Sequence, residues 1–283
     1  MILLTGATGK IGGETARQLV EKGASLRALV RDEAKAADLQ AAGVELVVGD
    51  IADADAVKRG MEGAEKAFLL LPNGEQQLAH EKQFTDIAVA CGVKHLVKMS
   101  SMEAVADAET PIPRTHWASE EYIRVSGLDW TMIKPNFFMQ NLLASAGSIR
   151  EKRKFFLPMG DGTTGMADAR DIGAVCAEVL TGEGHAGQSY EITGPEVLSF
   201  HDVADRFTEV LGEKVEYVPL PMDAFREKMT GILVPWHLNA VCELFREIAE
   251  TGLDHTTDTF RRLIGRDPIS VRQFIEDHVA LFK

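Results

Sequence analysis

Apolar residues in the first two thirds of the chain fall in short runs, and amphipathic segments of helix length lie between these runs. This alternation is typical of a parallel sheet with helices on both faces. Most of the helical segments stop at a glycine, which adopts the left-handed conformation after a last helical turn without a steric penalty. The expected strands are 2–5, 26–30, 44–48, 67–71, 95–100 and 130–134, and the expected helices are 11–22, 33–42, 53–60, 75–91 and 116–126.

After Pro135 the pattern changes and helical segments dominate. Helices are expected at 137–152, 168–181, 199–211, 221–230, 236–251 and 270–282, and strands only at 188–192 and 214–218. The chain is therefore predicted to be an α/β protein, with a Rossmann-type doubly wound parallel sheet at 1–155 and a smaller helix-rich C-terminal lobe at 156–283. Strand 188–192 resembles the earlier strands and is a candidate to return to the main sheet.

Composition and charge limit the classes of function. The 283 residues, 45% of them apolar, are enough for a sizeable core. A net charge of −13 argues against a general nucleic-acid binder, because phosphate neutralisation needs clustered Lys and Arg. The first strand begins at Ile2 and no window approaches 18 uncharged apolar residues, so we expect neither a secretory leader nor a membrane partner. The cysteines, Cys91, Cys176 and Cys242, lack metal-binding spacing and predict reduced thiols of a cytoplasmic protein without a metal site.

A glycine-rich turn joins the first strand to the first helix, in TGATGKIGG at 5–13. At such a junction Gly6 permits a tight turn, Gly9 lets the backbone approach a pyrophosphate, and Gly12 allows close packing of helix on strand. The helix N-terminus then offers free N–H groups to phosphates. A glycine pattern alone also fits an ordinary turn, but its place at the start of a βαβ unit favours dinucleotide binding.

The end of the second strand bears on which dinucleotide is bound. A site for NAD would place Asp or Glu there for the ribose 2′-hydroxyl, whereas this chain has Arg31 and Lys35, which suit the 2′-phosphate of NADP. Asp32 is the rival, although its position before a helix also suits an N-cap. Arg31 as a plain surface charge is the other alternative.

The third strand ends at Asp50 and Ile51. These residues would place a carboxylate near the adenine amine and an apolar side chain against the ring face. Asp50 as an N-cap of helix 53–60 is the alternative, although Asp53 fills that role better. The sequence thus predicts an adenine site beside the predicted phosphate sites.

Several segments resemble the NmrA-like branch of the atypical short-chain dehydrogenases/reductases, over nearly the whole chain. They are TGATGKIGG, VRDEAKA, GDIAD, LLLP, KMSS, EEYIRVSGLDWTMIKPNFFMQN and, in the later half, ADARDIGAVCAEVLTGEGHAGQSYEITGPEVLSF. That branch includes quinone-reductase-like and triphenylmethane-reductase-like enzymes as well as NADP-sensing regulators. The resemblance implies that the first domain holds NADP(H) over the carboxyl ends of the strands. We expect the lobe at 156–283 to contribute the substrate pocket.

Carried over position by position, the resemblance also implies a set of cofactor contacts. They are Gly6, Thr8, Gly9, Lys10 and Ile11 at the pyrophosphate, Arg31 and Lys35 at the 2′-phosphate, Leu70, Leu71 and Pro72 beside the adenosine and ribose, and Ser100, Pro135, Asn136, Phe137 and Phe138 at the nicotinamide. Packing in a core is an equal alternative for Phe137 and Phe138.

Many short-chain dehydrogenases pair a Tyr that donates a proton with a Lys four residues later, and this chain departs from that pattern. Ile112 occupies the Tyr position and His116 the Lys position, so an ordinary alcohol dehydrogenase is disfavoured. His116 would orient substrate or ribose, or donate a proton near neutral pH, unless it is a structural histidine. Ser101 is a second catalytic candidate, because a hydroxyl at the strand tip would polarise the acceptor.

An acceptor that is already electrophilic demands less acid catalysis. The leading hypothesis is therefore an NADPH-dependent reductase that transfers hydride directly to a small aromatic or quinone-like molecule, of the quinone, azo or triarylmethane type. The rivals are a non-catalytic NADP(H) sensor that binds a protein partner and, less favoured, an isomerase that uses bound NADP. The sequence leaves the oligomeric state open, with a homodimer as one alternative.

Replacing Arg31 with Asp is expected to weaken the binding of NADPH far more than that of NADH, because only NADPH carries the 2′-phosphate. Fluorescence titration of the purified variant with both nucleotides measures the two dissociation constants. We expect a loss of roughly tenfold or more for NADPH, which corresponds to about 1.4 kcal/mol. Equal weakening for both nucleotides would refute the 2′-phosphate role.

Overall fold

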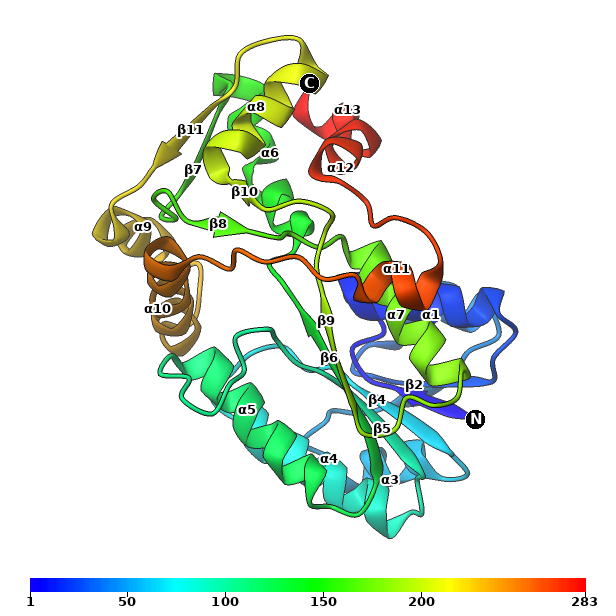
Figure 1. The fold of residues 1–283 in the computed structure, drawn as a ribbon. Coiled ribbons are helices and arrows are strands. Elements are labelled where there is room, and N and C mark those ends of the chain that lie inside the picture. Colours follow the sequence, from blue (N-terminus) through cyan, green and yellow to red (C-terminus); the bar gives the residue numbers. More distant parts are fainter. The chain divides into compact units, whose positions relative to one another are not determined.

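The computed structural model describes residues 1–283, and the chain forms two compact units (Figure 1). Unit 1 contains Met1–Glu109, Pro113–Lys134 and Ala169–Glu191, and unit 2 contains Thr110–Ile112, Pro135–Asp168 and Ile192–Lys283. Each unit is therefore built from separated stretches of chain rather than divided at one boundary near residue 155. The assignment of the nucleotide to 1–155 and of the substrate pocket to 156–283 stays a prediction.

Unit 1 is organised around a seven-stranded sheet with the strand order β3-β2-β1-β4-β5-β6-β9. Strands β1 to β6 pair in parallel, and the strand at 188–192 lies beside β6. This is the predicted Rossmann-type α/β fold. The strands are β1 (Ile2–Leu4), β2 (Leu26–Val30), β3 (Glu45–Val48), β4 (Lys66–Leu69), β5 (His95–Met99), β6 (Asp129–Pro135) and β9 (Gln188–Ile192).

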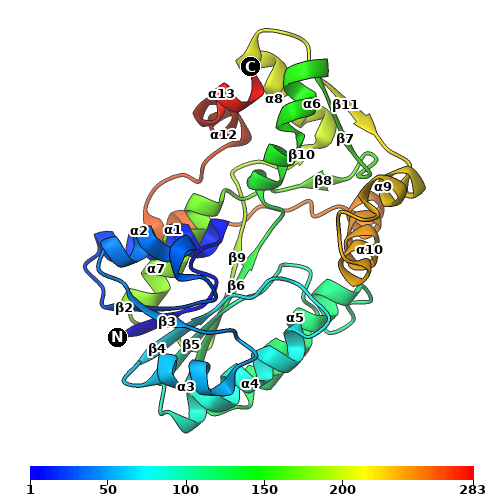
Figure 2. The ribbon, with the colours of Figure 1, turned by 180° about the vertical axis from the view of Figure 1, so that it is seen from behind.

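Helices cover both faces of this sheet, as Figures 1 and 2 show, with α1 and α7 on one face and α3, α4 and α5 on the other. Their bounds are α1 (Lys10–Glu21), η1 (Glu33–Ala36), α2 (Ala37–Ala41), α3 (Ala54–Met61), α4 (Gln77–Ala90), α5 (Pro111–Arg124) and α7 (Ala169–Thr181). Leu3, Phe84 and Leu96 belong to the core cluster of the unit. Helix α5 starts five residues earlier than predicted, because prolines are tolerated in a first helical turn, where the missing N–H needs no partner.

Unit 2 contains two small sheets, in which β10 runs antiparallel to β8 and β11 runs parallel to β7. Its core is rich in aromatic side chains, among them Phe155, Phe200, Phe207 and Phe274. The elements are η2 (Met139–Ser145), α6 (Ala146–Lys152), β7 (Lys154–Leu157), β8 (Thr163–Thr164), β10 (Leu198–Ser199), α8 (Phe200–Leu211), β11 (Glu216–Pro219), α9 (Met222–Met229), α10 (Pro235–Thr251), α11 (Thr259–Ile264), α12 (Val271–Asp277) and α13 (Val279–Phe282).

The helices predicted at 199–211, 221–230 and 236–251 are present as α8, α9 and α10, whereas 137–152 is η2 followed by α6 and 270–282 is divided into α12 and α13. The predicted helix 168–181 is α7 of unit 1, and β7, β8, β10 and α11 were not predicted. These elements are too short to show a period of their own in the sequence. Among all the helices of the chain, none is both apolar and long enough for a membrane span. The three cysteines are free, with Cys176 and Cys242 buried.

Two glycines allow the chain to turn sharply from β1 into α1. Gly6 has a positive φ of 67°, and a Cβ at this position would press against the backbone and side chain of Leu70. A Cβ at Gly12 would collide with the carbonyl oxygen of Gly6. The uses expected for Gly6 as a tight turn and for Gly12 as a close packing point therefore match the backbone.

Replacing Gly12 with Ala is expected to destabilise the fold by about 1–3 kcal/mol, because the added methyl has to displace backbone. Gly13 is the matched control in the same helix, since its Cβ would lie 3.5 Å from the carbonyl oxygen of Ala7, an ordinary contact. Gly13→Ala is expected to be neutral or stabilising by up to about 1 kcal/mol. Urea unfolding without cofactor measures both, and equal effects would contradict the packing argument.

Candidate active site

The strand order reverses between β1 and β4, and ligands of open α/β sheets bind at such a point, beyond the carboxyl ends of the strands. Thr5 connects the two strand ends. The N–H of Leu70 donates to Thr5 Oγ1 at 2.8 Å, and this hydroxyl lies 3.1 Å from the carbonyl oxygens of Phe68 and Leu70. The buried hydroxyl therefore fixes the start of the glycine turn against the segment that begins at Leu70.

The N-terminus of α1 follows this turn and has the features of an anion site. Gly9 precedes the helix in an extended conformation, no side chain caps the first turn, and that turn has no acidic residue. The helix dipole and its first amides therefore favour a phosphate group. Thr8, Gly9 and Lys10 are exposed, whereas Ile11 and Gly12 are buried. The residues predicted for the pyrophosphate thus fit such a group.

The segment after β2 contains Arg31 and Asp32, for which the sequence left alternative roles open. Asp32 caps η1, accepting from the N–H of Ala34 at 3.0 Å, and Lys35 Nζ lies 4.0 Å from its other oxygen. Asp32 therefore fills the capping role that was its alternative. The exposed side chain of Arg31 makes no ion pair with the protein, and its 2′-phosphate contact stays a prediction.

The segment after β3 shows a similar division between Asp50 and Asp53. Asp53 caps α3 by accepting from the N–H groups of Asp55 and Ala56, as expected. Asp50 accepts from the N–H of Ala52 at 2.9 Å and is exposed, so it does not cap the helix. The contacts of Asp50 and its neighbour Ile51 with adenine stay predictions.

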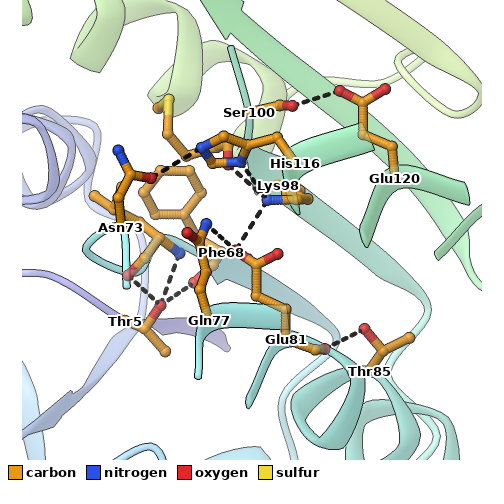
Figure 3. Close-up of polar contacts among 12 residues, drawn as sticks. Thr5, Phe68, Asn73, Gln77, Glu81, Thr85, Lys98, Ser100, His116 and Glu120 are labelled. Atoms are coloured by element: carbon orange, nitrogen blue, oxygen red, sulfur yellow. Dashed lines mark hydrogen bonds and ion pairs between the residues drawn. The ribbon is translucent and has the colours of Figure 1, made fainter. Parts of the chain in front are cut away.

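A buried ion pair lies beneath the ends of β4 and β5, in the region drawn in Figure 3. Lys98 of β5 and Glu81 of α4 are 0% and 1% exposed, and their charged atoms are 3.0 Å apart. Lys98 Nζ also donates to the carbonyl oxygen of Met99 at 3.0 Å and lies 3.1 Å from His116 Nδ1. Gln77 donates to the same Glu81 oxygen at 3.1 Å. We call these side chains, with Asn73, the Lys98 network.

His116 occupies a defined state within this network. Because an ammonium group can only donate, Nδ1 has to accept from Lys98, and the ring proton lies on Nε2, 3.2 Å from Asn73 Oδ1. Burial, with the positive charges of Lys98 and Lys134, lowers the pKa of His116 well below 6.5. The imidazole is therefore neutral near neutral pH, which favours the orienting role over proton donation.

A second group of buried charges surrounds Glu120, one turn beyond His116 in α5. The hydroxyl of Ser100 donates to its carboxylate, and Lys134 and Arg124 approach its oxygens at 3.4 and 2.7 Å. Lys134 Nζ also donates to the carbonyl oxygen of Ala104 at 2.7 Å. Ser100 is therefore engaged in the protein's own hydrogen bonding at the tip of β5.

Ser101 differs from its neighbour, because its Oγ is buried without any hydrogen-bond partner. A buried hydroxyl without a partner costs free energy, and such groups occur where a ligand or water completes the bonding. The predicted role of Ser101 at an acceptor is compatible with this state, although its contact with an acceptor stays a prediction.

Helix α5 presents neither the Tyr nor the Lys of an ordinary short-chain dehydrogenase. The side chain of Ile112 is buried. The nearest tyrosine, Tyr122, donates to Asp86 of α4 at 2.7 Å and has Lys82 over its ring. That tyrosine is engaged in packing between α4 and α5.

The remaining predicted residues, Pro135 to Phe138, belong to unit 2. Asn136 is buried and donates to the carbonyl oxygen of Leu253 at 3.2 Å. Phe137 packs edge-on against Phe200 with ring centroids 5.9 Å apart, which is the core packing left open as its alternative. The nicotinamide contacts of these residues stay predictions.

Lys98, Glu81, Glu120 and Lys134 were not identified in the sequence, although two signals were present. A charged residue inside an otherwise apolar strand of a parallel sheet is unusual, because such strands are buried on both faces. Polar residues also recur at every fourth position of two helices and so share one face. They are Gln77, Glu81 and Thr85 in α4, and His116, Glu120 and Arg124 in α5.

The fold and its glycine turn define a protein of the Rossmann type, and comparison with known proteins gives the family. The model of the NmrA-like family matches residues 1–272. An NAD(P)H azoreductase of Xenophilus azovorans is 36% identical over 283 residues, which cover 100% of this chain and 99% of that protein. The chain therefore belongs to the NmrA-like family, as its motifs predicted.

Solved structures support the same assignment. The NADPH-dependent quinone oxidoreductase of Escherichia coli in complex with NADPH has a TM-score of 0.88 and 26% identity, over 99% of this chain and 100% of that one. The triphenylmethane reductase of a Citrobacter species has a TM-score of 0.86 at 22% identity, over 98% and 99% of the two chains, a likeness of fold alone.

The two serines at the tip of β5 are expected to differ in their effects on stability. Ser100→Ala removes a donor from the buried carboxylate of Glu120 and is expected to cost about 1–3 kcal/mol. Ser101→Ala removes a buried hydroxyl without a partner and is expected to be neutral or stabilising by up to about 1–3 kcal/mol. Chemical unfolding compares them, and a larger loss for Ser101→Ala would show that its hydroxyl is bonded in the folded protein.

Proposed function

We propose that this protein is an NADPH-dependent reductase that transfers hydride directly to an electron-poor conjugated acceptor of the quinone, azo or triarylmethane type. The observation that carries the proposal is a buried His116, bonded to Lys98 and Asn73, at the position where a short-chain dehydrogenase has its Lys, with apolar Ile112 in place of the Tyr. A site with these residues lacks the usual means of protonating a poor acceptor. It suits an acceptor that is already electrophilic.

The relatives support the same class. Proteins that match this chain over its full length are named as an NAD(P)H azoreductase and a quinone oxidoreductase, so the class of NAD(P)H-dependent oxidoreductase is confirmed. The quinone oxidoreductase structure holds NADPH, and the azoreductase name covers both nucleotides. The preference for NADPH here is supported by Arg31, whose exposed guanidinium suits a 2′-phosphate.

Each part of the candidate site has a role in this proposal. The glycine turn and the first amides of α1 bind the pyrophosphate, and Ser101 supplies a hydroxyl to the acceptor. When bound there, NADPH would supply the hydride that the acceptor takes up. A cationic triarylmethane dye needs nothing more, whereas a quinone or azo bond also takes a proton, which comes from water. His116 orients the substrate or the ribose of the nucleotide and does not give up a proton.

The proposal also covers the cellular compartment of the protein and its partners. Cys176 and Cys242 are buried thiols, and burial raises the pKa of Cys176 to about 12, so this thiol stays protonated and unreactive. Unpaired cysteines are ordinary in a reducing compartment, which supports a place in the cytoplasm. The substrate is a small molecule, and a homodimer stays one alternative for the assembly.

Purified protein with NADPH is expected to reduce at least one quinone, azo compound or triarylmethane dye, with a turnover above about 1 s⁻¹. The loss of NADPH absorbance measures the rate for each acceptor. A simple ketone serves as the control, and its reduction is expected to be far slower, because the site has no Tyr–Lys pair to protonate the alkoxide.

Two outcomes would contradict the proposal. Tight binding of NADPH without oxidation by any acceptor would favour a nucleotide sensor instead. Reduction of the ketone as fast as the quinone would show that the site has an acid that the residues described here do not provide.

A further inference from the structure

The two nitrogens of His116 face different groups, and this difference determines which nitrogen carries the proton. Nδ1 faces the Lys98 ammonium at 3.1 Å, and Nε2 faces the amide oxygen of Asn73 at 3.2 Å (Figure 3). A proton on Nδ1 would point at an ammonium proton. The ring can therefore satisfy both neighbours only as the neutral tautomer with its proton on Nε2.

Lys98 itself cannot reach a ligand. Its ammonium has three protons to donate, and three acceptors surround it, on Glu81, on the carbonyl of Met99 and on His116. Its side chain is 0% exposed. Any effect of Lys98 on chemistry therefore has to act through His116.

We propose that Lys98 is a positioning residue, which with Glu81 holds His116 as the neutral imidazole protonated on Nε2 and oriented toward Asn73. Glu81 pairs with the Lys98 ammonium inside the sheet, and the ammonium donates to Nδ1. Nε2–H thus donates to Asn73 and fixes that side chain at the carboxyl ends of β4 and β5, the edge where the fold binds its ligand.

The charged groups around His116 also favour its neutral form. Lys98 on β5 and Lys134 on β6 oppose a positive ring, while Glu81 on α4 and Glu120 on α5 are paired with these lysines. Neither carboxylate is hydrogen-bonded to the imidazole, since the ring bonds only to Lys98 and Asn73. Protonation of His116 would therefore add a buried charge without a partner.

The catalytic part of this inference rests on the proposed reductase function. A neutral His116 keeps the same two hydrogen-bond partners at any pH at which the protein is folded. The turnover number of the wild type is therefore expected to show no inflection from His116 between about pH 6 and 8, where an ordinary histidine changes charge.

NMR of ¹⁵N-labelled full-length protein tests the state of the ring without any activity. In the wild type, the His116 nitrogens are expected to report a proton on Nε2 and no titration between about pH 5.5 and 8.5. Assignment follows from the loss of these signals in His116→Gln. Titration of wild-type His116 with an ordinary midpoint near 6.5 would overturn the proposal, whether or not any variant folds.

The double variant Lys98→Met with Glu81→Gln tests whether this buried pair holds His116 in its tautomer. It removes both buried charges together, and such neutral replacements of a buried pair are often tolerated, particularly since Glu81 Oε2 has no partner. The pKa of His116 is expected to rise, while burial and Lys134 still hold it below its ordinary value, and the ring nitrogens are expected to lose the fixed tautomer with its proton on Nε2. Turnover is expected to fall roughly 10- to 100-fold, because the ring is no longer held in one orientation. Unchanged His116 signals would overturn the proposal.

The matched control removes one Lys and one Glu from an exposed pair in the same unit. Lys22→Met with Glu178→Gln breaks an ion pair of 3.0 Å between α1 and α7 and is expected to leave the His116 signals and turnover unchanged. If no acceptor is reduced by the wild type, the reductase function fails, while the NMR titration still decides the role of Lys98.

Discussion

An ammonium group buried in a parallel sheet has to be neutralised where it lies, because transfer of an unpaired charge from water costs several kcal/mol even after relaxation. Lys98 meets this constraint with Glu81 from α4, the carbonyl of Met99 and the imidazole of His116 from α5. Two helices and one strand are thereby tied to one atom. The side chains at this edge of the sheet take their positions from that requirement.

The glycine turn and the Lys98 network meet at one short segment after β4. Thr5 holds Leu70 from the side of the turn, and His116 holds Asn73 from the side of α5. The backbone that separates these residues, Leu70 to Asn73, is therefore fixed at both ends by buried polar groups. A nucleotide contact predicted for Leu71 or Pro72 would rest on a rigid segment, and rigid supports preserve the geometry that hydride transfer requires.

Much of the sheet and its glycine turn could be predicted, because local patterns determine both. Most residues of the parallel strands are apolar and fall in short runs, and Gly6 and Gly12 stand where the backbone of a strand-to-helix turn approaches closely. Strand β7 could not be predicted, since its pairing with β11 joins residues about sixty positions apart. The Lys98 network was not predicted either, because its hydrogen bonds join four separate segments, and the signals within each segment do not say which segments meet.

The interleaved order of the two units has a consequence for synthesis of the chain. Strand β6 is complete at Pro135, but its neighbour β9 begins only at Gln188, after a long stretch that belongs to unit 2. Chains fold from the N-terminus as they leave the ribosome, and an unpaired strand edge is a template for pairing with other chains. A nascent chain that stops between these strands would present an open sheet edge, and aggregation or capture by a chaperone would then decide its fate.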